Sequence, residues 1–158
     1  MIELRKISIL DENMKECIEL EVAPEQRNFV AHNATSLGHA YAANKHGRNA
    51  VPYAIYADGV MVGFVMYGYV RKEDDIYGED CYFFWRFMMD QKHQGKGYGR
   101  QAMTMILDEI KTMPSGKVDY IYTSYEPENV VAKKLYESFG FVETGQMDDT
   151  EVIARLKI

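Results

Sequence analysis

A glycine-rich segment over residues 94–100, with the sequence QGKGYGR, restricts the fold of this chain more than any other stretch. It separates an apolar run over residues 82–89 from an amphipathic run over residues 100–113. Glycine tolerates positive φ angles and lets a ligand approach the backbone closely. Glycines at alternate positions just before a helix therefore predict an anion site, in which backbone N–H groups at the helix N-terminus bind a phosphate.

The composition predicts one globular domain over residues 1–158. A chain of 158 residues can bury a single core, and its hydrophobic and charged fractions, 47% and 27%, are ordinary for a folded protein. The formal net charge of -6 argues against a nucleic-acid partner and favours small cationic partners.

Cysteine usage and the first residues predict a cytoplasmic protein. Cys17 and Cys81 lie far apart without metal-ligand or CxxC spacing, so we expect two buried free thiols. Residues 1–4 lack the basic and apolar regions of a signal peptide. No apolar stretch approaches the roughly 20 residues that cross a membrane, so no membrane association is expected.

Apolar periodicity predicts alternating strands and helices. Strands are expected over residues 2–9, 51–57, 60–69, 82–89, 118–124, 141–144 and 152–158. Helices are expected after an Asp11 N-cap to residue 22, from residue 29 to a stop at Gly47, over residues 100–113, and from an Asn129 N-cap to a stop at Gly140. Asp58-Gly59 is the strongest turn signal, because two-residue hairpin turns need positive φ at both central positions.

A second motif decides between readings of the glycine-rich segment. A dinucleotide-binding motif would follow the first strand, and a P-loop needs Gly-Lys-Ser/Thr, but here Gly97 follows Gly95-Lys96. One strand later the chain reads Asn129-x-x-Ala132-x-x-Leu135-Tyr136-x-x-x-Gly140-Phe141. The two motifs in this order resemble the GNAT superfamily of acetyl-coenzyme A dependent N-acetyltransferases.

The resemblance implies an α/β fold with a mixed, mostly antiparallel sheet of six or seven strands, flanked by about four helices. It implies acetyl-coenzyme A as cosubstrate and no metal. The end of the apolar run, residues 87–89, would pair with the pantetheine arm of coenzyme A. The glycine turn would hold the pyrophosphate of the coenzyme, and the second motif would contact its pantetheine arm and its sulfur. The implied coenzyme-binding residues are Phe87, Met88, Met89, Gln94, Gly95, Lys96, Gly97, Tyr98, Gly99, Arg100, Asn129, Ala132, Lys133 and Tyr136.

Acetyl transfer to an amine requires a neutral nucleophile, a stabilised oxyanion and a proton for the leaving thiolate. The backbone N–H of Met89 can serve the oxyanion. Tyr136 can donate the proton, because a tyrosine with a pKa of about 10 stays protonated at pH 7. The alternative is that Tyr136 is one more tyrosine on a core stripe.

Residues 21–33, 85–90 and 94–99 look like the bacterial spermine/spermidine (diamine) acetyltransferase branch. A small-molecule amine is then the expected partner, with Glu21, Glu25, Trp85 and Tyr125 as substrate contacts and a homodimer as the assembly. Further carboxylates either contact the substrate or belong to a solvent-exposed loop: Glu73, Asp74, Asp75, Glu79 and Asp80.

The general base is open, because Trp85 stands where some relatives carry a glutamate. Glu21 acting through a water, Tyr53 and Tyr125 are the alternatives. The acceptor is open too: an amino-sugar antibiotic, an amino acid, or a protein N-terminus or lysine would need the same chemistry. A non-catalytic acetyl-coenzyme A binding protein is the remaining hypothesis.

The histidines do not predict a metal site. His32, His39 and His46 repeat every seven residues. Two helical turns separate neighbours by roughly 10 Å, which is too far for one metal ion. His93 is expected on the exposed glycine turn.

Overall fold

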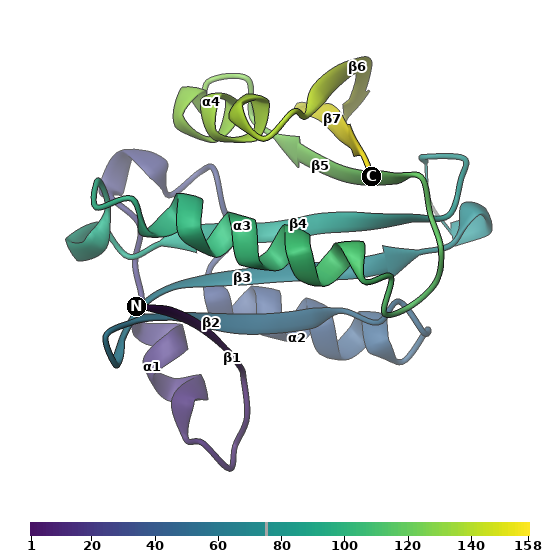
Figure 1. Ribbon diagram of the computed structural model, residues 1–158. Helices are drawn as coiled ribbons and strands as arrows, with labels where there is room; N and C mark the ends of the chain where they lie inside the picture. The colour runs from purple at the N-terminus through teal and green to yellow at the C-terminus, as the bar shows by residue number, and fades with distance from the viewer. Residues whose placement is uncertain (75) are drawn as a thin grey trace.

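A computed structural model describes residues 1–74 and 76–158 (Figure 1). The strands are β1 (Ile2–Lys6), β2 (Val51–Ala57), β3 (Val60–Val70), β4 (Cys81–Met89), β5 (Tyr120–Tyr125), β6 (Val142–Asp148) and β7 (Glu151–Lys157). The α-helices are α1 (Asn13–Glu19), α2 (Asn33–Asn44), α3 (Tyr98–Lys111) and α4 (Val130–Ser138). Short 3-10 turns are η1 (Pro24–Gln26), η2 (Lys72–Asp74) and η3 (Gln91–His93).

The strands form one sheet in the order β1-β2-β3-β4-β5-β7-β6. The β4–β5 pair is parallel, and the other five pairs are antiparallel. The predicted fold class, a mixed and mostly antiparallel sheet with flanking helices, is confirmed.

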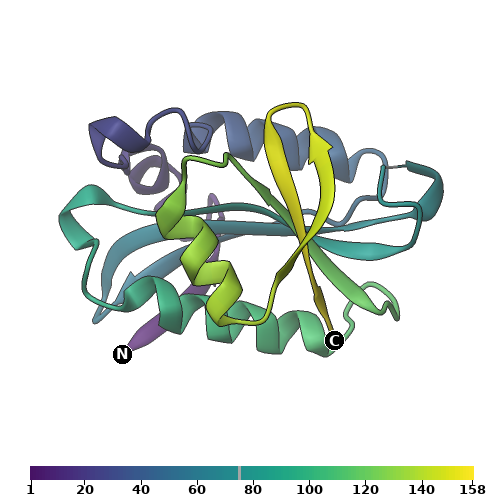
Figure 2. The ribbon, with the colours of Figure 1, turned by 90° about the horizontal axis from the view of Figure 1, so that it is seen from above.

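Helices cover both faces of the sheet (Figure 2). Helix α3 lies on one side, and α1 and α2 lie on the other. The amphipathic run over residues 100–113 predicts a buried stripe of Met103, Ile106, Ile110 and Met113. The first three are fully buried in the larger core cluster, whereas Met113 follows the end of α3 with a φ of 57° and is only partly buried. Cys17 of α1 and Ala40 of α2 belong to the second cluster, on the opposite face. Within the described residues, no helix is long and apolar enough to cross a membrane.

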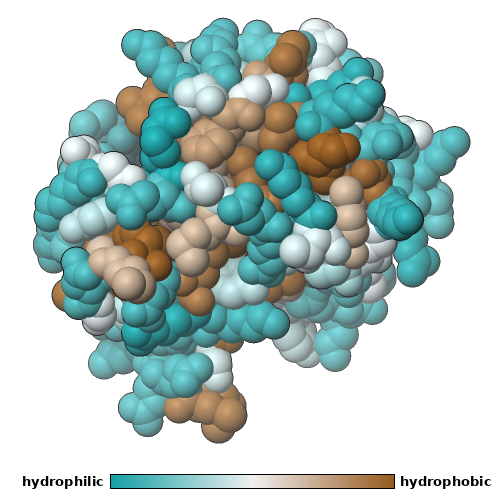
Figure 3. Space-filling model, in the orientation of Figure 1, coloured by the Kyte–Doolittle hydropathy of each residue, from teal (hydrophilic) through white to brown (hydrophobic). Residues whose placement is uncertain are grey.

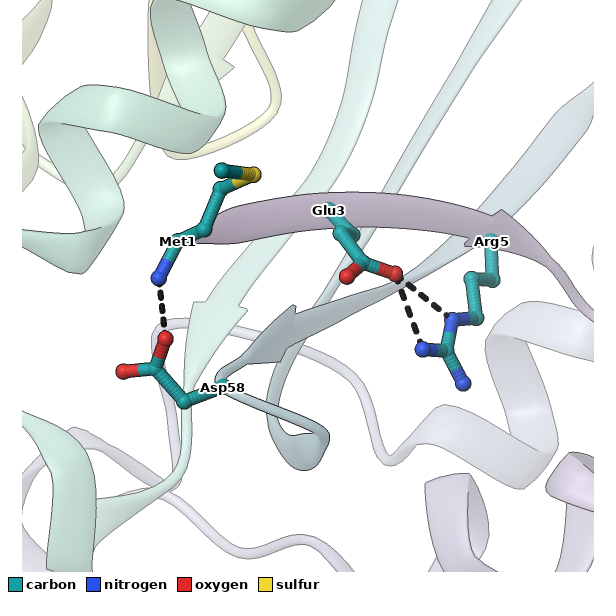
Figure 4. Close-up of polar contacts among 4 residues, drawn as sticks. All are labelled: Met1, Glu3, Arg5 and Asp58. Atoms are coloured by element: carbon teal, nitrogen blue, oxygen red, sulfur yellow. Dashed lines mark hydrogen bonds and ion pairs between the residues drawn. The ribbon is translucent and has the colours of Figure 1, made fainter.

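The β2–β3 hairpin turns at Asp58 and Gly59, whose φ angles are 51° and 82°. Both positive values confirm the turn that the sequence predicts. The N-terminal strand is held beside this hairpin, because Ile2 pairs with Ala57 and the α-amino group of Met1 forms an ion pair with Asp58 (Figure 4). Figure 4 also shows Arg5 bound to Glu3 on the same strand, at 2.8 Å.

The first strand and helix are shorter than predicted. Strand β1 ends at Lys6, and α1 starts at Asn13 without a side-chain cap from Asp11. The reason is the buried Asn13, whose Oδ1 accepts from the Ser8 amide and whose Nδ2 donates to the Lys6 carbonyl. These bonds fold residues 7–12 into a loop, and the hydrophobic patch at the lower edge of Figure 3 lies over it. Its Ile9 and Leu10 side chains are 79% and 90% exposed.

The second helix also starts later than predicted. Helix α2 begins at Asn33, and the ring of His32 caps it by accepting from the Ala34 amide at 3.2 Å. Phe29 and Val30, which fit the helical periodicity, lie before the helix and line a cavity instead. Helix α3 begins two residues earlier than predicted, at Tyr98.

Gly63 is required by packing in the centre of the sheet. A Cβ atom added there would lie 2.6 Å from the carbonyl oxygen of Met88, a backbone atom that cannot rotate away. Gly63→Ala is therefore expected to lower the free energy of unfolding by about 1–3 kcal/mol, as overpacking does. Gly38→Ala is the control, because a Cβ in that helix meets nothing within 4 Å. Equal stability of the two variants in urea unfolding would contradict this reading.

Candidate active site

Strands β4 and β5 diverge after a short paired segment. Their parallel pairing covers Tyr82, Phe83 and Phe84, opposite residues 121–123. On its other side β4 carries a bulge, because Tyr67 pairs with Phe84 while Met66 pairs with Arg86, leaving Trp85 as the extra residue. A bulge bends a strand and redirects its side chains. The second half of β4 is thereby free of β5.

A cavity of ≈ 390 Å³ lies where the strands part. Its walls come from the segment before α2, the second half of β4, the end of β5, the start of β7 and α4. The lining residues are Arg27, Asn28, Phe29, Val30, Ala31, Phe84, Trp85, Arg86, Phe87, Ser124, Tyr125, Asn129, Ala132, Tyr136 and Glu151.

The backbone amide of Met89 points toward the open side of β4. The amide of the next residue, Asp90, donates to the Val62 carbonyl of β3 at 2.9 Å. Successive residues of a strand direct their amides to opposite sides. Met89 therefore directs its N–H away from β3, where β5 has diverged.

The glycine turn is built for close approach to its backbone. Gly97 is the N-cap of α3, with a φ of 78° and no side-chain cap, and Gly95 has a φ of 74°. The first turn of α3 carries no acidic side chain. Uncapped N–H groups and the helix dipole favour an anion there. The exposed Lys96 adds a positive charge to the turn.

Hydrogen bonds join the glycine turn to the segment before α2. The side chain of Gln94 donates to the Met89 carbonyl at 3.0 Å and to Gln26 Oε1 at 2.7 Å. The Gln91 amide donates to the Glu21 carbonyl at 2.7 Å. The Glu21 amide in turn donates to the buried carboxylate of Asp90 at 3.2 Å. The two segments thus share one hydrogen-bonded support.

Two predicted coenzyme contacts are engaged by other groups. The guanidinium of Arg100 donates to Ser138 Oγ at 2.9 Å and lies over the ring of Phe139, which joins α3 to α4. Lys133 forms an ion pair with Glu143 at 2.8 Å and is not among the residues that line the cavity. The other predicted contacts of α4 do line it.

Tyr136 lies buried in the cavity wall on α4. Its ring stacks on Tyr125 with centroids 5.7 Å apart and contacts Phe84 and Phe141 edge-on. Burial raises the pKa of Tyr136 to about 12, a hydrogen bond with Thr123 lowers it, and the charge of Glu151 raises it. The hydroxyl is therefore protonated, and a proton donor, at neutral pH. Asn129 caps the same helix by accepting from the Ala132 amide at 3.2 Å, as predicted.

Of the predicted acceptor contacts, the structure brings Trp85 and Tyr125 to the cavity. Trp85 stacks on His39 with centroids 6.0 Å apart. The Tyr125 hydroxyl donates to Glu143 at 3.0 Å. Glu21 lines an adjoining hollow of ≈ 250 Å³, which shares Arg27, Val30 and Ala31 with the cavity, and its carboxylate lies 3.7 Å from Arg27. Glu25 is exposed on η1.

Four of the further predicted carboxylates, Glu73, Asp74, Glu79 and Asp80, are not among the residues that line the cavity. The carboxylate of Glu79 accepts from the Tyr122 hydroxyl at 2.6 Å, and that of Asp80 accepts from the Lys72 amide at 2.8 Å. Glu73 and Asp74 form part of η2, and the predicted contact Asp75 lies outside the described residues. Tyr53, a predicted proton carrier, donates to Glu109 at 2.8 Å in the α3 core instead.

Sequence reasoning missed three charged side chains that line the cavity: Arg27, Arg86 and Glu151. Arg86 was visible as a cation within an apolar strand. Its Nε has no hydrogen-bond partner among the described residues, while its terminal nitrogens reach the Trp85 carbonyl at 2.8 Å and His39 Nδ1 at 3.4 Å. Burial lowers the pKa of Arg86, and the charge of Glu151 raises it. Glu151 gave no local signal, because the β5-β7-β6 strand order brings it there.

Comparison with known proteins agrees with this arrangement. The model of the acetyltransferase (GNAT) family matches residues 14–141. This chain belongs to the GNAT acetyltransferase family. The predicted resemblance is confirmed, and it extends to the bacterial spermine/spermidine branch. The spermine/spermidine N(1)-acetyltransferase of Bacillus subtilis (strain 168) is 27% identical to this GNAT chain over 141 residues, 89% of each protein.

Solved structures share the GNAT fold along the whole chain. Spermidine N-acetyltransferase from Vibrio cholerae, in complex with CoA and spermine, has a TM-score of 0.69 and 20% identity, covering 99% of this chain and 94% of that one. An aminoglycoside acetyltransferase in complex with coenzyme A and kanamycin has a TM-score of 0.74 and 16% identity, covering 99% and 95%. At these identities the likeness shows the fold.

Proposed function

We propose that this protein transfers an acetyl group from acetyl-coenzyme A to a primary amine of a polyamine or diamine, such as spermidine or spermine. The observation that carries the proposal is the divergence of β4 from β5, which opens a cavity lined by Phe87 near the end of β4 and by Tyr136 of α4. A donor thioester and an acceptor amine can meet there. A single domain over residues 1–158, a homodimer and a cytoplasmic location stay predictions.

The residues present fit coenzyme A. The uncapped N-terminus of α3 after Gly97 suits a pyrophosphate. The backbone of Phe87 and Met89, which points away from β3, suits an extended pantetheine arm. Asn129 lines the same cavity as Phe87. Coenzyme A would supply the activated acetyl thioester; the protein supplies the binding and the proton transfers.

We assign the oxyanion contact to the Met89 amide and the proton for the departing sulfur to Tyr136. Direct attack by the amine is supported by the position of both cysteines. Cys17 and Cys81 are buried and do not line the cavity. Burial, with a smaller contribution from Glu16, raises the pKa of Cys17 to about 12, which suppresses the thiolate.

The polyamine acceptor is supported by the Bacillus subtilis relative, by the net charge of -6 and by the aromatic surface of Trp85 in the cavity. Arg86 favours a second candidate. A half-buried guanidinium, whose Nε–H finds no acceptor in the part of the chain that the structure describes, repels an ammonium and attracts a carboxylate or carbonyl. The second candidate acceptor is therefore an amine next to such a group, as in an amino acid or a protein N-terminus.

A panel of acceptors tests both candidates, with release of free thiol from acetyl-coenzyme A as the readout. Spermidine, spermine and putrescine are compared with kanamycin, alanine and a short peptide. We expect kcat/KM for the best polyamine to exceed that of the other amines roughly 10-fold or more. A preference for alanine or the peptide favours the second candidate. Calorimetric binding of coenzyme A without turnover of any amine indicates a non-catalytic binding protein.

A further inference from the structure

The proposed reaction lacks a group to receive the acceptor's proton. An alkyl amine with a pKa of about 10.4 is neutral in only a few molecules per ten thousand at pH 7. Glu21 lies outside the cavity lining, and Tyr53 is bound to Glu109. Tyr125 lines the cavity, but burial first and the Glu143 carboxylate second raise its pKa and keep the proton on the ring.

Glu151 is the carboxylate among the residues that line the cavity. It opens β7, next to the end of β5, and its Oε2 accepts from Ser124 Oγ at 2.5 Å. Within the described part of the chain, Ser124 is the sole hydrogen-bond partner of this carboxylate. One carboxylate oxygen is thereby held in place, and the other remains available to a ligand.

Glu151 lines the same cavity as Tyr136, the assigned acid, and Arg86. Its charge raises the pKa of both groups. The carboxylate of Glu151 and the Tyr136 hydroxyl can therefore serve the amine and the sulfur of one reaction. Arg27 and Arg86, the two cations of the cavity lining, disfavour several cationic groups at once, so the lining charges favour one ammonium beside Glu151.

We propose that Glu151, oriented by Ser124, binds the acceptor ammonium and removes its proton; this rests on the function proposed above. The neutral nitrogen then attacks the thioester carbonyl and forms the C–N bond. The C–S bond breaks as the intermediate collapses, and Tyr136 protonates the thiolate. The nitrogen loses its second proton, which restores Tyr136 through water, and Glu151 returns the first proton to solvent.

Glu151→Gln tests the proposal, because it keeps the shape and the Ser124 hydrogen bond but cannot take a proton. With spermidine at pH 7 we expect kcat/KM to fall about 100-fold, as for loss of a general base. The kcat/KM of the variant should then rise tenfold per pH unit up to the pKa of the amine, because the variant can use only the fraction of amine that is already neutral in solution. The wild-type rate should stay level over the same range.

Glu19→Gln on α1 is the matched control, since it removes the same charge from an exposed position outside the cavity. Calorimetric binding of coenzyme A at wild-type affinity verifies the fold of each variant. A Glu151→Gln profile that follows the wild type, or a loss that is uniform across pH, would overturn the proposal. If the wild type acetylates another amine but not spermidine, only the proposal of a polyamine acceptor fails. The role of Glu151 is then tested by the same pH profiles with that amine.

Discussion

Tyr136→Phe is expected to lower kcat about 100-fold, because it removes the proton donor for the leaving sulfur. The hydroxyl lies in a buried wall, and burial, first among the causes, raises the pKa of Tyr136 to about 12. A group with this pKa donates at neutral pH without ionising. The ring contacts with Phe84, Tyr125 and Phe141 do not need the hydroxyl, so the variant should fold normally.

Tyr125→Phe is the matched control for this prediction. The two rings stack on each other, but the Tyr125 hydroxyl is turned to Glu143. Steady-state kinetics with both substrates varied should show a fall in kcat for Tyr136→Phe and little change in the KM for acetyl-coenzyme A. If the two variants had equal kcat values, Tyr136 would not be the acid, and its role would be packing in the core.

Gly97→Val is expected to weaken coenzyme A binding about 10- to 100-fold. The loss corresponds to one charge-assisted hydrogen bond, at about 1.5–3 kcal/mol, with 1.4 kcal/mol per factor of ten. Gly97 precedes the uncapped end of α3 with a φ of 78° and open space beside it. A β-branched side chain there both strains the backbone and covers the N–H groups that would face the pyrophosphate.

Gly47→Val is the control for Gly97→Val, because it introduces the same backbone strain away from the proposed coenzyme site. Gly47 has a φ of 73°, also has nothing within 4 Å of an added Cβ, and follows α2 outside the cavity lining. Each substitution should cost about 1–2 kcal/mol of stability through the left-handed conformation. Calorimetry should detect weakened coenzyme A binding for Gly97→Val only. If both variants bind like the wild type, the glycine turn is not the phosphate site.

Local signals explain what the sequence predicted well. Asp58 and Gly59 determine the hairpin because both adopt the positive φ angles that a two-residue turn needs. Asn129 begins α4 through its capping hydrogen bond, and Gly140 ends the helix with a φ of 94°. Each signal acts within a few residues, so no tertiary contact can override it easily. The glycine turn and Tyr136 were placed correctly in the fold for the same reason.

Tertiary contacts decided what the sequence could not predict. Phe29 satisfies a helical period, but it faces the cavity before α2 begins. The buried Asn13 side chain replaces an Asp11 cap that the local sequence favours. Glu151 reaches the cavity through the order of the last strands, and Trp85 becomes a bulge through the register of β3 with β4. Pairing between distant segments produces no recognisable pattern in the local sequence, so it could not be predicted.

The hydrogen bonds between the glycine turn and the segment before α2 connect the donor and acceptor sides of the cavity. Gln94 bonds to Gln26, and Asp90 and Gln91 bond to the backbone of Glu21. A shift of the turn when the donor side fills would move the wall that Phe29 and Val30 present to the acceptor. Thermodynamic reciprocity would then require the acceptor to change the affinity for the donor by the same factor, and these few bonds would carry that coupling.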